Sequence, residues 1–498
     1  MSLKTFAAGF FAKYVVHRTK KWSSRPVGTQ QKVLKSLIGK AKRTQFGTDH
    51  NFERITTPAQ FAKNVPVRDY EQLRPYIERT VAGEKNILWP GKPIYFAKTS
   101  GTTSGAKYIP ITKGALPYHT RAARDAILHY IAETGNKKFV DGKMIFLQGS
   151  PKMTEKNGIK FGRLSGIVAH YVPAYLQRNR LPSWETNCIA DWEKKVDAIV
   201  EETKAENMTV ISGIPSWVQM YFERLIAATG KKVEELFPNF DLFIYGGVNY
   251  GPYRSKFNEL MGRKVDSIEL FPASEGFFAF QDTQREEGLL LLLNSGIYYE
   301  FIKAEEFFTE TPKRFTIGEV KKGVNYVMIV STNAGLWAYN VGDTVQFTSL
   351  APHRVIVSGR IKHFISAFGE HVIGKEVEQA MKAASKKMVF SITEFTVAPQ
   401  TDPPKGQLPY HEWLVEFDTP AENIEALSAM LDSEMKAQNS YYFDLIEGKI
   451  LQPLVVTVLR KGSFKEYMKS QGKLGGQNKA ARLSNDRKVA NALLQLQL

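Results

Sequence analysis

Hydrophobic and polar positions alternate with two different periods along this chain, and each period predicts a different kind of element. Residues 1–90 read as mainly helical and polar, up to the break at Trp89-Pro90-Gly91. Beyond it, the extended runs KMIFLQG, MTVIS and DLFIYGG are separated by longer segments with helical spacing, such as 190–206 and 215–229. This order predicts βα units around a largely parallel sheet.

Between about residues 266 and 360 the pattern changes to short runs rich in aromatic and β-branched residues. The runs are IELFP, FFAFQ, LLLLLN, IYYEFI, YVMIVST and RVIVSG. They predict antiparallel strands that form a second sheet or a barrel attached to the first.

After SGRIKHFIS the chain alternates again on a smaller scale. The predicted elements are helices near 374–385 and 421–437 and strands near 388–398, 411–418 and 454–459. The expected fold is therefore α/β, with a large N-terminal domain and a small, mobile α+β C-terminal domain. The large domain, residues 1–362, has mixed and parallel sheets and an antiparallel, barrel-like part; the small one comprises residues 363–498.

Composition narrows the class of protein. Hydrophobic residues make up 43% and aromatic residues 12% of the chain, which excludes a disordered protein. No run of about 18 apolar residues occurs, so no transmembrane segment is expected. The stretch LKTFAAGFFAKYVVHRTKKW predicts an amphipathic first helix, with a targeting or membrane-surface segment as the alternative. The single cysteine, Cys188, excludes an internal disulfide and a Cys-built zinc site and fits a cytoplasmic protein.

The charge balance points to anionic partners. The chain has 67 Lys and Arg against 50 Asp and Glu, a net charge of +17. Nucleic acid and polyanionic small molecules such as ATP both fit such a total. No zinc finger, RNA-binding aromatic signature or heptad with a basic region accompanies the charge, so we expect no nucleic-acid partner.

One short stretch has the chemistry of a phosphate-binding loop. YFAKTSGTTSGAKYIPIT, residues 95–112, places glycines and hydroxyl residues between two strand-like runs. It is not a Walker A loop, because Gly101, Gly105 and Lys107 have the wrong spacing and Tyr108 occupies the place of the Mg²⁺-binding hydroxyl. It also lacks the second and third glycines of the Rossmann fingerprint. Glycines still let backbone N–H groups converge on a phosphate, and Lys107 supplies charge, whereas composition alone favours a surface turn.

The pattern of this loop and of six later segments identifies a resemblance. TSGTTSGAKYIP resembles the phosphate-binding loop TSGTT-G-x-x-K of the adenylate-forming superfamily, whose members activate a carboxylate as an acyl-adenylate. LFPASEGFFAF resembles the second motif of that superfamily, AGLWAYNVGDTVQFT the third (YRxGD), and VSGRIKHF its hinge segment. Together with YYEFI, FIYGGVNYGPY and GKLGGQNKAARLSNDR, they resemble the auxin-responsive promoter family of acyl acid amido synthetases, in particular its bacterial-type members, over residues 90–490.

The resemblance implies an ATP site. Its ATP- and AMP-binding residues would be Thr99, Ser100, Gly101, Thr102, Thr103, Ser104, Gly105, Lys107, Gly246, Gly247, Val248, Phe271, Ala273, Ser274, Tyr339, Asp343 and Arg360. Residues 99–107 would hold the phosphates, in a loop one residue shorter before its lysine than in many relatives. Residues 246–248 would line the adenine, and Asp343 would bind the ribose hydroxyls with help from Arg360.

The resemblance also implies catalytic or metal-binding roles for three further residues. Glu275 would hold Mg²⁺, although a lone Glu after a strand is by itself typical of a solvated surface. Lys479, in GGQNKAAR, would enter the active site and stabilise charge during adenylation, and Lys362 would mark the hinge; both are expected to be catalytic. Asn340 replaces the arginine of the third motif, so the cation that relatives have there is absent.

The expected activity is that of an ATP- and Mg²⁺-dependent ligase. A small-molecule carboxylic acid would form acyl-AMP, and an amine, such as that of an amino acid, would then take the acyl group. The acid pocket would involve segments 121–131 and 163–176 with Tyr171 and Tyr175, which are equally good core residues. A thiol acceptor such as coenzyme A is the alternative. A non-catalytic basic scaffold for nucleic acid or anionic lipid is the alternative from another class.

Overall fold

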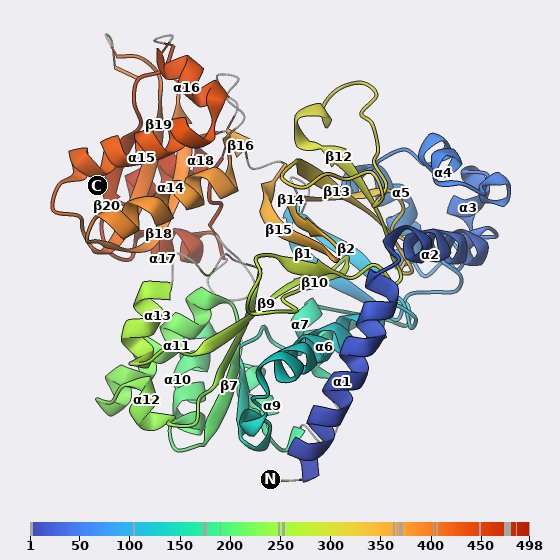
Figure 1. Ribbon diagram of the computed structural model, residues 1–498, viewed down its shortest axis with the longest axis horizontal. Coiled ribbons are helices and arrows are strands. Elements are labelled where there is room, and N and C mark those ends of the chain that lie inside the picture. The colour runs from blue at the N-terminus through green and yellow to red at the C-terminus, as the bar shows by residue number, and fades with distance from the viewer. Residues whose placement is uncertain are drawn as a thin grey trace. The chain divides into compact units, whose positions relative to one another are not determined.

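The computed structural model describes residues 3–497 except 103–104, 173–176, 190, 248–249, 251–253, 362–363, 366, 368–371, 402, 405–406, 448–449, 473–479 and 485. The chain folds into two compact units (Figure 1). Unit 1 comprises residues 1–248, 261–341 and 345–356, and unit 2 comprises residues 249–260, 342–344 and 357–498. A domain boundary at residue 362 stays a prediction.

The N-terminal segment is helical, as its sequence predicts. The helices are α1 (Leu3–Ser23), α2 (Pro26–Ala41), α3 (Gln45–Asp49), α4 (Pro58–Asn64) and α5 (Tyr70–Val81). Both α4 and α5 begin with a capping box, in which the side chains of Thr57 and Asp69 accept hydrogen bonds from the amides of Gln60 and Gln72. These reciprocal bonds satisfy amides that a helix start leaves without partners. Among the described residues, no helix is long and apolar enough to span a bilayer.

One mixed sheet of 11 strands forms the centre of the fold. In spatial order its strands are β12 (Ile297–Lys303), β13 (Asn325–Thr332), β14 (Tyr339–Leu350), β15 (His353–Arg360), β11 (Leu289–Leu291), β10 (Gly276–Phe280), β9 (Asp266–Ala273), β8 (Leu242–Gly246), β7 (Met208–Ser212), β3 (Lys143–Phe146) and β6 (Arg180–Leu181). The pairs from β6 to β9 are parallel, and β9–β10, β10–β11, β11–β15 and β12–β13 are antiparallel.

The antiparallel strands do not form a sheet of their own. The sequence predicts a second sheet or barrel between residues 266 and 360, and the strands themselves are confirmed. Strand β9 pairs parallel with β8 on one side and antiparallel with β10 on the other, so hydrogen bonding runs through both regions without a break. The expectation of a second sheet from this region is therefore wrong, because β9 belongs to both patterns.

Helices cover both faces of the parallel part of this sheet. Figure 1 shows α1 and α6 (Leu116–Thr134) on one side of β7, and α10 (Trp192–Thr203) and α11 (Pro215–Thr229) on the other. Buried apolar side chains of α1 and α6 form one core cluster with those of β7 to β11. Smaller helices of unit 1 are α7 (Leu164–Ala169), α9 (Trp184–Asn187) and α12 (Val233–Leu236).

A second sheet of four strands is built from other segments of unit 1. Its order is β2 (Gly105–Ile111), β1 (Tyr95–Thr102), β5 (Ile159–Gly162) and β4 (Thr154–Lys156). Strand β1 pairs antiparallel with β2 and parallel with β5, and α7 packs against it. This sheet therefore contains the hairpin that the sequence marks as a phosphate-binding loop.

Unit 2 contains the predicted α+β tail. A three-stranded sheet of β18 (Ser391–Gln400), β19 (Tyr410–Thr419) and β20 (Val455–Leu459) packs with α14 (Gly374–Lys387) and α15 (Ile424–Gln438) around its own core. Its other elements are α13 (Arg254–Met261), β16 (Phe364–Ile365), β17 (Val372–Ile373), α16 (Ser440–Glu447), α17 (Ser463–Ser470) and α18 (Lys488–Gln495). A separate core explains why this part is compact on its own.

Candidate active site

The carboxyl ends of β8 and β9 bring two of the sequence motifs together. Gly246, the last residue of β8, lies opposite Leu270 in the parallel pair with β9. Strand β9 continues to Ala273 and turns into β10, where Gly276 pairs back with Ala273. The carboxyl ends of neighbouring parallel strands lie at one edge of a sheet, which is where α/β proteins commonly bind ligands. The glycines after DLFIY and the turn of the second motif thus share this edge.

Backbone geometry requires glycine at both positions of that first motif. A Cβ atom on Gly246 would lie 2.5 Å from the carbonyl oxygen of Leu270, closer than any side chain tolerates. Gly247 has a φ of +76°, which favours glycine. Strand pairing is thus sufficient to explain why residue 246 is a glycine, and no ligand is needed for that explanation. Because glycine has no side chain, the backbone at this edge is also left uncovered. Val248 lies outside the described residues.

The turn of the second motif is half-buried. Phe271 is buried and packs edge-to-face on Phe278, with 5.2 Å between ring centroids, so it anchors the strand end in the core. Ala273, Ser274 and Glu275 are half-buried. Their position at the end of β9 makes them the part of the motif that a ligand at this edge would meet.

Glu275 is the candidate metal ligand of this turn. Within the described part of the chain, no three His, Cys, Asp or Glu side chains are grouped so that they could hold a metal ion. Mg²⁺ commonly binds one or two carboxylates and completes its coordination with water and phosphate oxygens. One carboxylate at this turn therefore fits Mg²⁺ carried by a polyphosphate and does not fit a metal held by protein ligands alone.

The hairpin β1–β2 carries the candidate phosphate-binding residues. Thr99 lies opposite Lys107 and Thr102 opposite Gly105, with an irregularity in the register between them. The segment is therefore a bulged hairpin and not an extended loop, and Ser100 and Gly101 lie in the bulge. Bulges of this kind occur next to active sites, where they redirect the backbone. Thr103 and Ser104, at the tip, lie outside the described residues.

Lys107 is positioned by a residue that the sequence did not indicate. Its Nζ lies 5.6 Å from the centre of the Tyr70 ring, and the Tyr70 hydroxyl accepts a 2.9 Å hydrogen bond from the amide of Tyr108. Burial raises the pKa of Tyr70, so the ring stays neutral. A cation over an aromatic face is stabilised there. Tyr70 starts α5, and no pattern in the sequence links it to the hairpin.

In unit 2 the structure joins the two residues predicted at the ribose. Asp343 Oδ1 lies 2.9 Å from Arg360 Nε, and the Asp343 side chain is only 17% exposed while that of Arg360 is 54% exposed. The amide of Ile361 donates a 2.8 Å hydrogen bond to the carbonyl of Gly342, whose φ is +85°. The ion pair fixes the orientation of the Asp343 carboxylate, which is what a carboxylate that binds two hydroxyl groups needs.

The start of the third motif is a core segment. Tyr339 is fully buried, and its backbone pairs with that of Arg68. A packing role accounts for this ring, and a contact with nucleotide stays a prediction. Asn340 donates its amide to the carbonyl of Arg68, but the guanidinium of Arg68 donates to His50 Nε2 at 2.9 Å. One end of the Arg68 guanidinium is therefore fixed by His50.

A pair of tyrosines links β1 to the segment after α7. The hydroxyls of Tyr95 and Tyr171 are hydrogen-bonded at 2.6 Å, and their rings meet edge-to-face. Burial and this hydrogen bond raise the pKa of Tyr95 to about 12, so its hydroxyl stays protonated at neutral pH. Tyr171 was predicted to line the acid pocket. Tyr95 was missed, although it is the first residue of the strand that leads into the phosphate-binding hairpin.

The two predicted catalytic lysines, Lys362 and Lys479, lie outside the described residues. The chain directly after Lys479 is anchored in unit 2. Thr396 Oγ1 donates a 2.7 Å hydrogen bond to the carbonyl of Ala481, the amide of Val397 donates to the carbonyl of Arg482 at 3.0 Å, and Leu483 is fully buried. The segment Ala481–Leu483 is thus fixed against β18.

Comparison with known proteins decides the family. The sequence matches the GH3 family N-terminal domain over residues 15–187, the GH3 family central domain over 290–360 and the GH3 family C-terminal domain over 375–488. Together these matches cover well over half of the chain. The chain belongs to the GH3 family. The resemblance seen in the motifs is thereby confirmed at the level of the family.

Full-length relatives of this GH3 chain have low sequence identity to it. It is 21% identical to indole-3-acetic acid-amido synthetase GH3.3 of Arabidopsis thaliana, with 88% of this chain and 86% of the relative covered. It is 22% identical to jasmonoyl-L-amino acid synthetase GH3.5 of Oryza sativa subsp. japonica, with 90% of each covered. Both relatives are named as synthetases, one for an amide of indole-3-acetic acid and one for jasmonoyl-L-amino acid.

Solved structures confirm the fold. GH3.15 acyl acid amido synthetase superposes with a TM-score of 0.78 at 15% identity, covering 96% of this chain and 95% of that one. 2-Hydroxyisobutyryl-CoA ligase, in the postadenylation state with 2-HIB-AMP, superposes with a TM-score of 0.59 at 14% identity, covering 95% and 91%. The predicted α/β fold with a small C-terminal α/β region is confirmed.

Proposed function

We propose that this GH3 chain is an acyl acid amido synthetase that adenylates a carboxylic acid and transfers the acyl group to the amine of an amino acid. The observation that carries the proposal is the placement of the motifs. The bulged hairpin with Lys107, the strand-end glycines and the half-buried turn at Glu275 support the binding of a polyphosphate nucleotide.

In the first half-reaction, a carboxylate oxygen attacks the α-phosphorus of ATP. The bond between that phosphorus and the bridging oxygen breaks, and pyrophosphate leaves. Lys107 and the backbone N–H groups of the hairpin would hold the β- and γ-phosphates, and Asp343 would fix the ribose. Mg²⁺, held by Glu275 and phosphate oxygens, would neutralise part of the triphosphate charge. Lys479 would stabilise the charge that develops at the α-phosphate.

In the second half-reaction, the nitrogen of a neutral amine attacks the acyl carbon. The bond from this carbon to the phosphate oxygen breaks, AMP leaves, and the amine loses its proton to solvent. The chain's contribution is to position the reactants and to exclude water from the acyl-adenylate. Lys362 would be the hinge residue of the change between the two half-reactions.

The acid would bind beside β1. The hydrogen bond between Tyr95 and Tyr171 joins this strand to the segment after α7. Tyr95 lies four residues before Thr99 on the same strand. The protonated hydroxyl of Tyr95, next to apolar rings, suits an acid with an apolar body and leaves its carboxylate to be placed by the phosphate-binding side. This arrangement supports a monocarboxylic acid as the substrate class.

The test is pyrophosphate release across a panel of carboxylic acids. Wild-type protein is expected to release pyrophosphate only with ATP, Mg²⁺ and an acid, and to form a hydroxamate when hydroxylamine replaces the amine. Consumption of amino acids but not of coenzyme A would support the amide product, and the reverse would favour a thiol acceptor.

Two tail lysines provide a matched comparison. Lys479→Ala is expected to lower the adenylation rate about 100-fold, because it removes the cation that would stabilise the negative charge developing at the α-phosphate. Lys488→Ala removes an equal charge from an exposed position on α18 and should leave the rate unchanged. Full activity of Lys479→Ala would remove this lysine from the mechanism.

A further inference from the structure

The first 48 residues concentrate the positive charge of the molecule. They contain eleven Lys and Arg and no Asp or Glu, and the first acidic residue is Asp49. Eleven of the seventeen excess positive charges thus come from about a tenth of the chain. These residues form α1 and α2, and neither helix contains a carboxylate that could neutralise a neighbouring lysine. A charge so distributed is an electrostatic feature of one region and not of the whole surface.

Part of this charge surrounds a cavity in unit 1. The cavity has a volume of about 470 Å³ and lies where the end of α1 and the length of α2 face α6 and the turns next to β12 and β13. Lys21, Arg25, Lys32 and Lys40 line it, and no lining residue is acidic. Arg25, Lys32 and Lys40 follow one another at intervals of two helical turns, so they lie along one face of α2.

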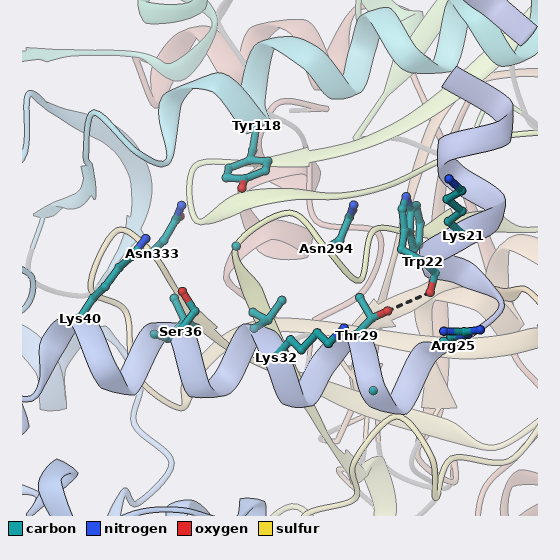
Figure 2. A pocket seen from close by; sticks show the side chains of 14 residues that line it. Lys21, Trp22, Arg25, Thr29, Lys32, Ser36, Lys40, Tyr118, Asn294 and Asn333 are labelled. Atoms are coloured by element: carbon teal, nitrogen blue, oxygen red, sulfur yellow. Dashed lines mark hydrogen bonds between the residues drawn. The ribbon is translucent and has the colours of Figure 1, made fainter. Parts of the chain in front are cut away.

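The opposite wall supplies neutral hydrogen-bond donors. Figure 2 shows Tyr118 from α6 pointing toward the cavity, with Asn294 and Asn333 beside it. Asn333 is held in place, because its side-chain amide donates a 3.1 Å hydrogen bond to the carbonyl of Gly114. Hydroxyl and amide groups next to four cations provide the donors that multiply charged oxyanions need.

The four cations have no partner within the described part of the chain. None of them forms an ion pair or a side-chain hydrogen bond there, in contrast to the buried arginines Arg314 and Arg354. All four side chains are exposed at this open cavity, so a ligand from solution can reach them. A ligand with several anionic groups can contact more than one of these cations at once, whereas a singly charged anion cannot. None of the lining residues belongs to the candidate ATP site.

We propose that this cavity binds a ligand with two or more phosphate groups, held by Lys21, Arg25, Lys32 and Lys40. The phosphates come either from a free metabolite or from a lipid headgroup. The exposed aromatic residues Phe10 and Tyr14 on the neighbouring α1 make the second source testable, since aromatic and basic residues on one helix are typical of membrane-surface helices. The proposal does not depend on the amido synthetase activity.

Calorimetric titration of the full chain with inositol 1,4,5-trisphosphate tests the site, because this probe is neither a nucleotide nor a product of the proposed reaction. Wild-type protein is expected to bind it, and Lys32→Glu/Lys40→Glu should weaken binding by about tenfold for each reversed charge. Ser36→Trp, which fills the cavity without changing charge, should abolish binding.

The matched control is Lys35→Glu. Lys35 is exposed on the same helix but does not line the cavity, so this variant should bind like wild type. Equal weakening by Lys35→Glu, or unchanged binding by both cavity variants, would show attraction to the basic surface in general and overturn the site. Thermal midpoints of all variants establish that they fold.

Sedimentation with phosphatidylcholine vesicles, with and without phosphatidylinositol bisphosphate, separates the two sources. If the protein sediments only with the anionic vesicles, and Phe10→Ser/Tyr14→Ser abolishes this without affecting the trisphosphate titration, the ligand is a headgroup. If it binds the trisphosphate and stays in solution, the ligand is a free metabolite. Binding to neither probe would overturn the proposal.

Discussion

Burial without a hydrogen-bond partner determines the charge of His119 on α6. Its side chain is 6% exposed, and its Nδ1 has no partner within the described residues. Burial lowers the pKa of His119 from 6.5 to about 4, because the charged imidazolium is poorly solvated in the core. The unfolded chain therefore binds a proton between these two pH values and the folded chain does not.

His119 thus makes the protein sensitive to acid. The free energy of unfolding should fall as the pH drops from 6.5 to about 4, with His119 contributing about 3 kcal/mol at most. His119→Leu should lose less stability over this range than wild type. Urea unfolding of both proteins at neutral pH and near the lower limit measures the difference. An identical pH dependence would mean that the imidazole is solvated in the folded state.

Asp343 is the residue on which the proposed ribose contact depends. Asp343→Asn keeps the shape of the side chain but removes the charge that Arg360 fixes at 2.9 Å. It should raise the KM for ATP about 10- to 100-fold, since a hydrogen bond to a charged group is worth more than one to a neutral group, and change the KM for the acid little. Asp418→Asn, which breaks the ion pair with Lys256 elsewhere in unit 2, is the control. An unchanged KM for ATP would exclude the contact.

At the scale of elements, the edge formed by β8 and β9 depends on close strand approach. Gly246→Ala would place a Cβ atom 2.5 Å from the carbonyl oxygen of Leu270. The two strands would then have to move apart, and the turn at Gly247 would be displaced as well. We expect lower stability and weaker nucleotide binding, measured by thermal unfolding and titration with ATP. Gly39→Ala on α2 meets nothing within 4 Å and should raise stability by about 0.5–1 kcal/mol. A Gly246→Ala variant as stable as wild type would contradict this geometry.

A buried ion pair attaches α4 to the main sheet. The side chain of Glu300, on β12, is 3% exposed, and that of its partner Arg314, which follows β12 in the chain, is 8% exposed. Arg314 Nη1 also donates a 3.0 Å hydrogen bond to the carbonyl of Ala62 in α4. Burial raises the pKa of Glu300, which opposes the effect of its arginine partner. The carboxylate is therefore tolerated in the core only because Arg314 is present.

Removing one partner should cost more than removing both. Arg314→Met leaves Glu300 buried without a partner and should destabilise the protein by about 3–5 kcal/mol. The double variant Glu300→Leu/Arg314→Met should recover most of this loss. Denaturant unfolding of the two variants measures both effects. If the double variant were the less stable of the two, the unpaired Glu300 carboxylate would not be the cause of the loss in Arg314→Met.

Local patterns predicted elements well and their pairing poorly. Helix α11 was predicted as 215–229, and those are its bounds, because Pro215 starts it and Gly230 ends it in the left-handed conformation. The place of β9 was not predictable, since periodicity contains no information on which strand lies beside which. For the same reason, the contacts of Lys107 with Tyr70 and of Tyr171 with Tyr95 join residues far apart in sequence and were not foreseen. Asp343 and Arg360 were foreseen together because the motifs of the resemblance contain both.

At the scale of the whole molecule, the positive charge has one interpretation at the N-terminal helices and another at the hairpin β1–β2. The sequence alone suggested anionic partners from a total of +17. Eleven of these seventeen charges come from the first 48 residues, which include α1 and α2, whereas Lys107 is one cation of the hairpin. The ATP site and the basic cavity are therefore separate proposals, and each can fail without the other.

Acid-dependent pyrophosphate release is the most direct test of the central claim. We predict release by wild-type protein with at least one carboxylic acid of the panel, a rate about 100-fold lower for Lys107→Ala, and an unchanged rate for Lys35→Ala. The same rate for Lys107→Ala and wild type, or no acid-dependent release with any acid, would contradict the assignment of the bulged hairpin as the phosphate-binding site of an acyl-adenylating enzyme.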